Sequence, residues 1–125
     1  MSELESKLQR RCQKILKDGG AFVFKTHADM YSRKGIPDLV SCIPATEETI
    51  KELLDAGWFK NNKIGLFVAF ECKREGELDV FDDRRKAQEI VGKEIKNAGG
   101  IWYAIDDSDI VDAILSTIKG ELDVI

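Results

Sequence analysis

The chain has 125 residues, of which 43% are hydrophobic and 34% charged, and its formal net charge is -4. This length suffices for one core of ordinary size, and no stretch reads as a linker, so we expect a single domain over residues 1–125. No apolar run is long enough to span a membrane, and the charged start is unlike a signal peptide. The sequence therefore predicts a cytoplasmic protein with no membrane partner.

The spacing of the three cysteines indicates whether they form disulfides, bind zinc or stay free thiols. Cys12, Cys42 and Cys72 are odd in number and widely spaced, and no CxxC pair or neighbouring histidine accompanies them. Each lies on a predicted apolar face. We expect buried free thiols rather than zinc ligands or disulfides.

A helix, two strands and a second helix are predicted in the first half of the chain. The first helix starts at a Ser2-x-x-Glu5 capping box and ends at a Gly-Gly pair. Its expected inward stripe is Leu4, Leu8, Cys12 and Ile15. Strands are predicted over 21–26 and 36–43. Residues 46–63 form a helical insertion, with a helix over 46–56 that Thr46 caps. This insertion either packs on the core of its own domain or offers Trp58 and Phe59 to a second subunit.

In the second half of the chain, the residue pattern predicts a strand over 65–73, a helix over 82–98, a strand over 101–105 and a helix from about Ser108 to Lys119. Two inward helical stripes are expected, one of Ala87, Ile90, Val91, Ile95 and Ala98, the other of Val111, Ile114, Leu115 and Ile118. Residues 121–125 are expected to be a disordered tail. The order is αβββαβα with an extra helix between strands 2 and 3, which indicates an α/β fold with a mixed sheet flanked by helices.

Two carboxylates and an amine lie at the ends of two predicted strands. Asp38 follows Pro37 at a strand entrance, and strand alternation puts Glu71 and Lys73 on one face. Carboxylates can hold a Mg²⁺ ion that brings positive charge to a phosphodiester, and the lysine can act as base or water positioner, a choice that stays open. A plain turn at Pro-Asp and a solvated Glu-x-Lys strand are the structural alternatives, but the residues before Glu71 read as core.

The order Pro37-Asp38, Glu71-x-Lys73 and Gln88 resembles the PD-(D/E)xK nuclease superfamily. The Gly-Ile-Pro-Asp-Leu context is similar to its virus-type replication and repair nuclease (VRR-NUC) branch, over roughly residues 3–105. The resemblance implies a restriction-endonuclease-like fold. It further implies that Asp38 and Glu71 bind Mg²⁺, for which Mn²⁺ substitutes, that Lys73 activates water and that Gln88 orients the site.

The same resemblance assigns two further metal ligands. The Cys72 backbone carbonyl would be one, and Glu5 matches an acidic residue that completes the site from the first helix. For Glu5 a capping role alone is the alternative. Small standalone members of the family are similar to Holliday-junction resolvases and work as homodimers, so a homodimer is implied here.

The acidic balance of the chain opposes DNA binding, which depends on phosphate neutralisation. Lysines and arginines near the candidate site provide positive charge locally. The residues expected to contact DNA are Tyr31, Arg33, Lys34, Arg74 and Arg84. A solvated loop is the alternative for Tyr31 and Arg33. The leading prediction is a metal-dependent DNA endonuclease, structure-selective on branched DNA such as Holliday junctions. The alternatives are a non-catalytic DNA-binding or interaction module, or a nuclease acting on flaps, nicks or duplex DNA.

Overall fold

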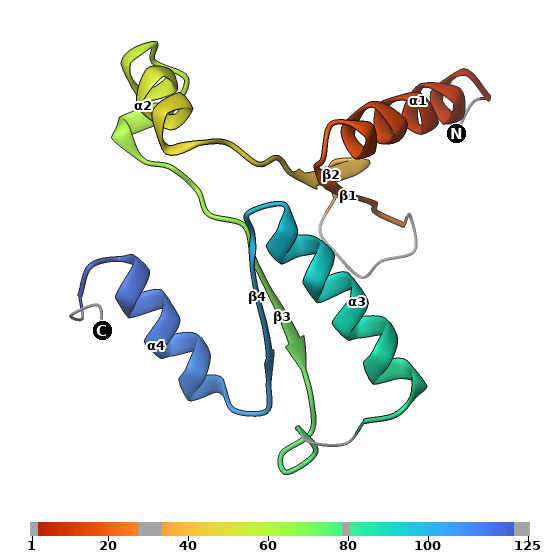
Figure 1. The fold of residues 1–125 in the computed structure, drawn as a ribbon, viewed down its shortest axis with the longest axis vertical. Coiled ribbons are helices and arrows are strands. Elements are labelled where there is room, and N and C mark those ends of the chain that lie inside the picture. The colour runs from red at the N-terminus through yellow and green to blue at the C-terminus, as the bar shows by residue number, and fades with distance from the viewer. Residues whose placement is uncertain (1–2, 28–33, 79–80, 122–125) are drawn as a thin grey trace.

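The computed structural model describes residues 3–27, 34–78 and 81–121. The elements in chain order are α1 (Glu3–Asp18), β1 (Phe22–Lys25), β2 (Leu39–Cys42), α2 (Glu47–Asp55), a 3-10 turn (Lys60–Asn62), β3 (Val68–Cys72), α3 (Asp83–Asn97), β4 (Ile101–Ile105) and α4 (Ser108–Ile118). Figure 1 shows this mixed α/β arrangement. The order αββαβαβα confirms the one predicted from the sequence, including the extra helix between the second and third strands.

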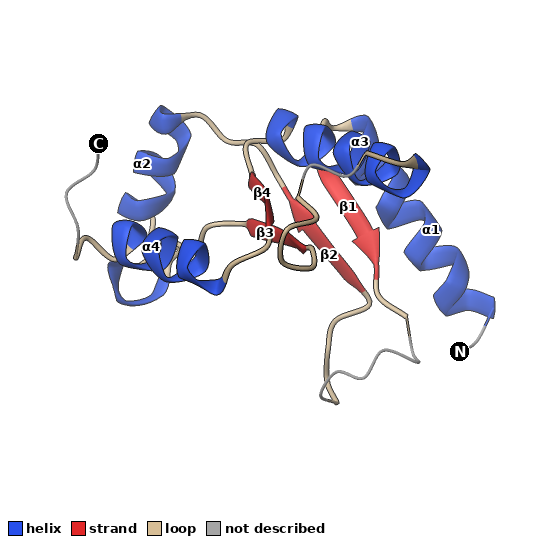
Figure 2. Ribbon diagram, turned by 90° about the horizontal axis from the view of Figure 1, so that it is seen from below, coloured by secondary structure: helices blue, strands red, loops and turns tan. Residues whose placement is uncertain are grey.

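The strands form two separate pairs. β1 and β2 pair antiparallel, with Phe22 opposite Cys42 and Lys25 opposite Leu39, and β3 and β4 pair parallel, with Val68 opposite Ile101. A single mixed sheet was expected, but the described strands join into two two-stranded sheets. β3 and β4 are seen lengthwise in Figure 1, and β1 and β2 in Figure 2, so the two pairs run in different directions. The long connection through α2 does not fix a register between β2 and β3, as the tight turn of a hairpin would.

Local capping signals set the helix boundaries. Thr46 caps α2 as predicted, because its hydroxyl accepts a hydrogen bond from the Thr49 backbone N–H at 3.1 Å. Gly57 follows this helix with a φ of 77°, a conformation that favours glycine. Asp82 caps α3 by accepting from the Arg85 backbone N–H at 2.9 Å. These boundaries therefore follow from local hydrogen bonding.

The most buried apolar groups meet where the two strand pairs approach each other. The thiol of Cys42, at the end of β2, donates to the Ala98 carbonyl at 3.6 Å. Ile95 and Ala98, at the end of α3, are 3% and 2% exposed. On the neighbouring strand the Phe22 ring lies 6.0 Å from the Phe67 ring, centroid to centroid. We call this junction the corner; it ties the end of β2 to the start of β3 and β4.

Several predicted inward stripes are wrong. On α1, Leu4, Leu8 and Ile15 are exposed, whereas Gln9 is buried and Cys12 and Leu16 are half-buried. On α3, Ala87, Ile90 and Val91 are exposed, whereas Ile95 and Ala98 are buried as predicted. On α4, Leu115 and Ile118 are exposed and Val111 and Ile114 half-buried. α1 packs on β1 and β2 and α3 packs on β4, and a two-stranded sheet is too narrow to cover a whole apolar stripe.

The cysteines are free thiols, as predicted, but only one of them is buried. Cys42 is buried, Cys12 is half-buried and Cys72 is exposed, so the prediction of burial is wrong for Cys72. Burial of Cys42 raises the pKa of its thiol, because desolvation disfavours the thiolate. The Cys42 sulfur therefore stays protonated and serves as a packing group and hydrogen-bond donor.

The helical insertion stands apart from the rest of the molecule (Figure 1). α2 has no buried residue, and Trp58 after it is 72% exposed. The prediction that this segment packs on the core of its own domain is therefore wrong for Trp58. Its alternative, a contact with a second subunit, stays a prediction. None of the described helices has both the length and the apolar character that crossing a membrane requires.

Candidate active site

Glu71, Lys73 and Gln88 meet at the end of β3. The Lys73 ammonium donates to the Gln88 side-chain carbonyl, and the Gln88 amide nitrogen donates to Glu71 Oε1. Lys73 Nζ and Glu71 Oε1 are 4.0 Å apart. The structure thus joins three of the four predicted catalytic residues in one hydrogen-bonded chain, in which the glutamine links the two charged groups.

Strand alternation and the following helix build this cluster. Glu71 and Lys73 are two residues apart and therefore share a face, whereas Phe70 lies on the opposite face and stacks on Tyr103 at 6.4 Å. The Lys73 backbone N–H donates to the Ile105 carbonyl at 2.7 Å, so the β3–β4 ladder continues to Lys73. α3 returns over the face that carries Glu71 and Lys73, and presents Gln88 to both.

The cluster is sheltered from water only in part. The Lys73 side chain is 17% exposed and the Glu71 side chain 32%. Both groups are therefore charged side chains with limited hydration, and such groups are costly unless hydrogen-bonded. Gln88 meets that requirement because its amide can accept from the ammonium and donate to the carboxylate at once. Among the described residues, Glu71 Oε2 has no hydrogen-bond partner.

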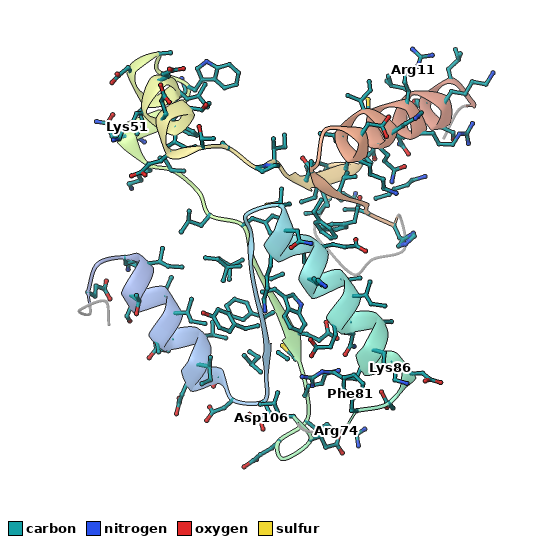
Figure 3. The ribbon with its side chains drawn as sticks, viewed as in Figure 1. Arg11, Lys51, Arg74, Phe81, Lys86 and Asp106 are labelled. Carbon is teal, nitrogen blue, oxygen red and sulfur yellow. The ribbon has the colours of Figure 1, made fainter. Side chains whose placement is uncertain are left out.

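A hollow of about 280 Å³ lies past the end of β3, and Lys73 is one of the residues that line it. Its lining residues are Cys72, Lys73, Arg74, Glu77, Asp82 and Arg84. Two of the residues predicted to contact DNA, Arg74 and Arg84, thus line the same hollow as Lys73, and Figure 3 shows Arg74 close to the end of β3. Three cationic side chains around one hollow suit an anion with several oxygens, such as a phosphate. The two acids of the lining limit the net positive charge there.

Asp38 lies just before β2 and is exposed. As predicted from Pro37, it stands at a strand entrance: the Thr26 backbone N–H donates to the Asp38 carbonyl at 3.0 Å, one step beyond the β1–β2 ladder. Cys42, at the other end of β2, holds the corner, so Asp38 is separated from the corner by roughly 13 Å of strand. No hydrogen bond or ion pair between described residues joins Asp38 to Glu71, Lys73 or Gln88.

The remaining predicted residues lie outside the cluster or outside the described chain. Glu5 is exposed, on the flank of α1 that carries Gln9 and faces β1 and β2. Lys34 is exposed, and Tyr31 and Arg33 lie outside the described residues. The Cys72 carbonyl adjoins the cluster. Because Lys73 and Phe67 bond to β4, the backbone of Cys72 points to the other edge of β3, where no described strand pairs.

The structure adds residues that the sequence analysis overlooked. Glu77 and Asp82 line the hollow, and Arg85 holds the segment before α3 by donating to the Leu78 carbonyl at 2.7 Å and to Glu89 at 2.8 Å. For Asp82 a signal was present, since an aspartate directly before a helical pattern is typical of an N-cap. For Arg85 the i, i+4 spacing to Glu89 was a signal, whereas its bond to the Leu78 backbone carbonyl has no sequence pattern.

Comparisons with models of protein families, with curated proteins and with solved structures gave no match for this chain. The fold and the Glu71–Gln88–Lys73 cluster are therefore the basis on which a function is assigned.

Proposed function

We propose that the chain is a metal-dependent DNA endonuclease of the PD-(D/E)xK type, similar to VRR-NUC domains, that acts as a homodimer on branched DNA such as Holliday junctions. One observation carries the proposal: Glu71, Gln88 and Lys73 form a hydrogen-bonded chain beside a hollow with three cations. An acid, an amine and cationic side chains that can hold a phosphate are the parts that hydrolysis of a phosphodiester requires.

The available donors fit a hard divalent cation. Glu71 has a second carboxylate oxygen that accepts no hydrogen bond from described residues, and the Cys72 carbonyl faces away from the ladder. Asp38 would add a second carboxylate. Oxygen donors of this kind suit Mg²⁺. When bound, the ion would offset charge on the scissile phosphate and make a water molecule more acidic.

Asp38 would join this donor set if β2 lay along the free edge of β3. Cys42 and Phe67 already meet at the corner, where they line one hollow. In an antiparallel pairing from that point, four residues back along β2 leads to Asp38, and four residues forward along β3 leads to Glu71. Both lie about 13 Å from the corner, so they would be level with each other. We propose this single, restriction-endonuclease-like sheet as the active arrangement.

The protein residues then have separable roles. Gln88 holds the Lys73 amine and the Glu71 carboxylate in fixed positions relative to each other, which limits the motion of a flexible lysine. Lys73 lines the hollow, and its amine would bind a phosphate oxygen there or take a proton from the attacking water. Arg74 and Arg84 would bind neighbouring phosphate oxygens.

A cleavage panel tests the proposal. Purified protein is incubated with four-way junction, flap, nicked and duplex DNA in Mg²⁺ or Mn²⁺, alongside Asp38→Asn, Lys73→Met and the control Lys119→Met, which alters an exposed lysine of similar charge. We expect junction cleavage that falls about 100-fold or more in the first two variants and is unchanged in the control. Full activity of Asp38→Asn or Lys73→Met would refute the proposal.

A second candidate is a non-catalytic DNA-binding or interaction module, which the position of Asp38 outside the cluster favours. Calorimetric titration with Mg²⁺ separates the two functions. The nuclease should bind the ion with an affinity that Glu71→Gln and Asp38→Asn both reduce. A module would bind branched DNA with the same affinity whether or not these carboxylates are present, and would cleave none of the substrates.

A further inference from the structure

The outer edge of β4 pairs with no other described strand. The Ile101 backbone N–H donates to the Phe67 carbonyl, and the Lys73 N–H donates to the Ile105 carbonyl. Because alternate residues of a parallel strand bond the same neighbour, Trp102 and Ala104 direct their N–H and C=O groups to the opposite edge of β4. No described strand pairs with that edge. β4 therefore presents unpaired backbone donors and acceptors in a row.

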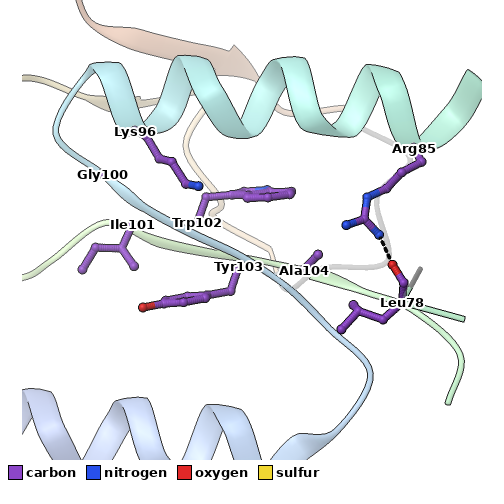
Figure 4. Close-up of a pocket in the computed structure, with 8 residues that line it drawn as sticks. All are labelled: Leu78, Arg85, Lys96, Gly100, Ile101, Trp102, Tyr103 and Ala104. Carbon is purple, nitrogen blue, oxygen red and sulfur yellow. Dashed lines mark hydrogen bonds between the residues drawn. The ribbon is translucent and has the colours of Figure 1, made fainter. Parts of the chain in front are cut away.

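A groove of about 590 Å³ runs along this edge. Its lining residues are Gly100, Ile101, Trp102, Tyr103 and Ala104 of the strand region, with Leu78, Arg85 and Lys96. Figure 4 shows Trp102 pointing towards α3 and Tyr103 pointing towards α4. On the α3 side a second hollow of about 380 Å³ is lined by Trp102 and Ile90 together with Glu89, Lys93 and Lys96. An added strand would thus lie beside Trp102 and the charged side chains of α3 on one face, and beside Tyr103 on the other.

Nothing in β4 protects this edge. Natural edge strands are blunted by lysines, prolines, bulges or inward charges. The β4 sequence Ile-Trp-Tyr-Ala-Ile contains none of these residues, and its pairing with β3 runs through all five positions without a bulge. Aromatic and β-branched residues also favour the extended conformation. An edge of this kind is a template for pairing with another strand.

We propose that β4 pairs antiparallel with β4 of a second copy of the chain, about a two-fold axis at Tyr103. In this register Trp102 lies opposite Ala104 of the second copy, so the bulky ring faces the smallest side chain of the strand. Each such pair exchanges two backbone hydrogen bonds, because these are the residues whose backbone groups face outward. Tyr103 lies opposite its own copy, on the α4 face, as an aromatic cross-strand pair.

The amount of open surface favours a second copy over a short peptide. The chain exposes 10325 Å², whereas a compact monomer of this mass would expose about 6,700 Å². A stable dimer needs only about 800 Å² from each partner. The exposed large apolar residues of α3, β4 and α4, the elements drawn in Figure 4, are Ile90, Val91, Tyr103, Ile110, Leu115 and Ile118. They lie on α3, β4 and α4, so a single added strand would leave the two helices uncovered, whereas a second copy brings its own.

The pairing would place two candidate sites on one continuous sheet. A two-fold axis perpendicular to a sheet keeps equivalent side chains on the same face, so both Glu71–Gln88–Lys73 clusters would face one side. Their β3 strands would be three strand spacings apart, about 14 Å. The use of this arrangement in cutting two DNA strands rests on the proposed function, but the interface itself does not.

The interface can be tested without DNA or metal. Sedimentation or light scattering at 50 µM should give twice the mass of 14.1 kDa for the wild type. Tyr103→Lys places like charges opposite each other and should weaken association at least 30-fold with an unchanged circular dichroism spectrum. The control Trp58→Lys, at the exposed end of the insertion, should stay dimeric. A monomeric wild type, or a dimer that Trp58→Lys breaks and Tyr103→Lys does not, would overturn the proposal.

Disulfide trapping covers the case in which Tyr103→Lys fails to fold. In a Cys12→Ser, Cys72→Ser background, Tyr103→Cys should form a cross-linked dimer within minutes of mild oxidation, since directly opposed residues come within disulfide reach. Trp58→Cys, an exposed position on the insertion that does not line the groove, is the matched control and should not cross-link. Equal cross-linking of both variants, or of neither, would contradict the register.

Discussion

The contact between Gly92 and Trp102 provides a direct test of the packing that positions Gln88. Gly92 is buried in the middle of α3, and a Cβ added there would lie 2.5 Å from Trp102 Cδ2 and 2.7 Å from Cε2. Ordinary carbon contacts are longer by roughly 1 Å. The Gly92→Ala substitution therefore requires the helix or the indole ring to move by about that amount.

Two opposing terms decide the sign of the effect. Alanine is favoured over glycine inside a helix by about 1 kcal/mol, which alone would stabilise the variant. Overpacking against a ring costs about 1–3 kcal/mol, and the Lys96 ammonium, 5.5 Å above the Trp102 ring, restricts the room to move. We expect Gly92→Ala to lower the free energy of unfolding by about 1 kcal/mol net.

Urea unfolding followed by circular dichroism and by tryptophan fluorescence measures this difference. Ala87→Gly, at an exposed position of the same helix, is the control that reports the propensity term alone, with a loss of about 1 kcal/mol. A Gly92→Ala variant that is more stable than the wild type by the full propensity gain would show that α3 does not lie on Trp102. The placement of Gln88 over β3 would then fail as well.

Three further predictions address the site and the corner. Gln88→Ala removes the hydrogen-bond partner of both Lys73 and Glu71, so it should lower the unfolding free energy by about 1–3 kcal/mol in a urea titration. The control Glu94→Ala, on the exposed side of α3, should change it by less than about 0.5 kcal/mol. Burial raises the pKa of the Cys42 thiol above its ordinary value of 9.0. The share of the unfolding free energy that depends on the protonated thiol is therefore fully present below that value and is lost as the pH rises through the pKa of the folded state. Unfolding measured from pH 7 to pH 10 should show this loss in the wild type and not in Cys42→Ala. Asp82→Ala should lower the unfolding free energy by about 1 kcal/mol, because it removes the N-cap of α3. Asp83→Ala is the neighbouring control, and equal losses in the two variants would show that the Asp82 side chain does not act as a cap.

The linear order of elements was predictable from the sequence, because its signals are local. Thr46 and Gly57 bracket α2, and the glycines after Ala98 end α3, since capping and positive φ depend on neighbouring residues only. The shared face of Glu71 and Lys73 follows from a two-residue repeat. The direction of each helical stripe was less predictable. Leu8 is exposed and Gln9 buried, because α1 contacts β1 and β2 through the flank that carries Gln9, Cys12 and Leu16.

The amino-acid sequence alone therefore determined the elements, their order, and the pairing of an acid and an amine on one strand face, because each of these depends on residues within a few positions of one another. Only the tertiary structure decided that Gln88 links Glu71 to Lys73, that Asp38 stands at the far end of β2, and that β4 keeps an open edge. These features depend on how separate segments approach in space, which local sequence patterns do not encode.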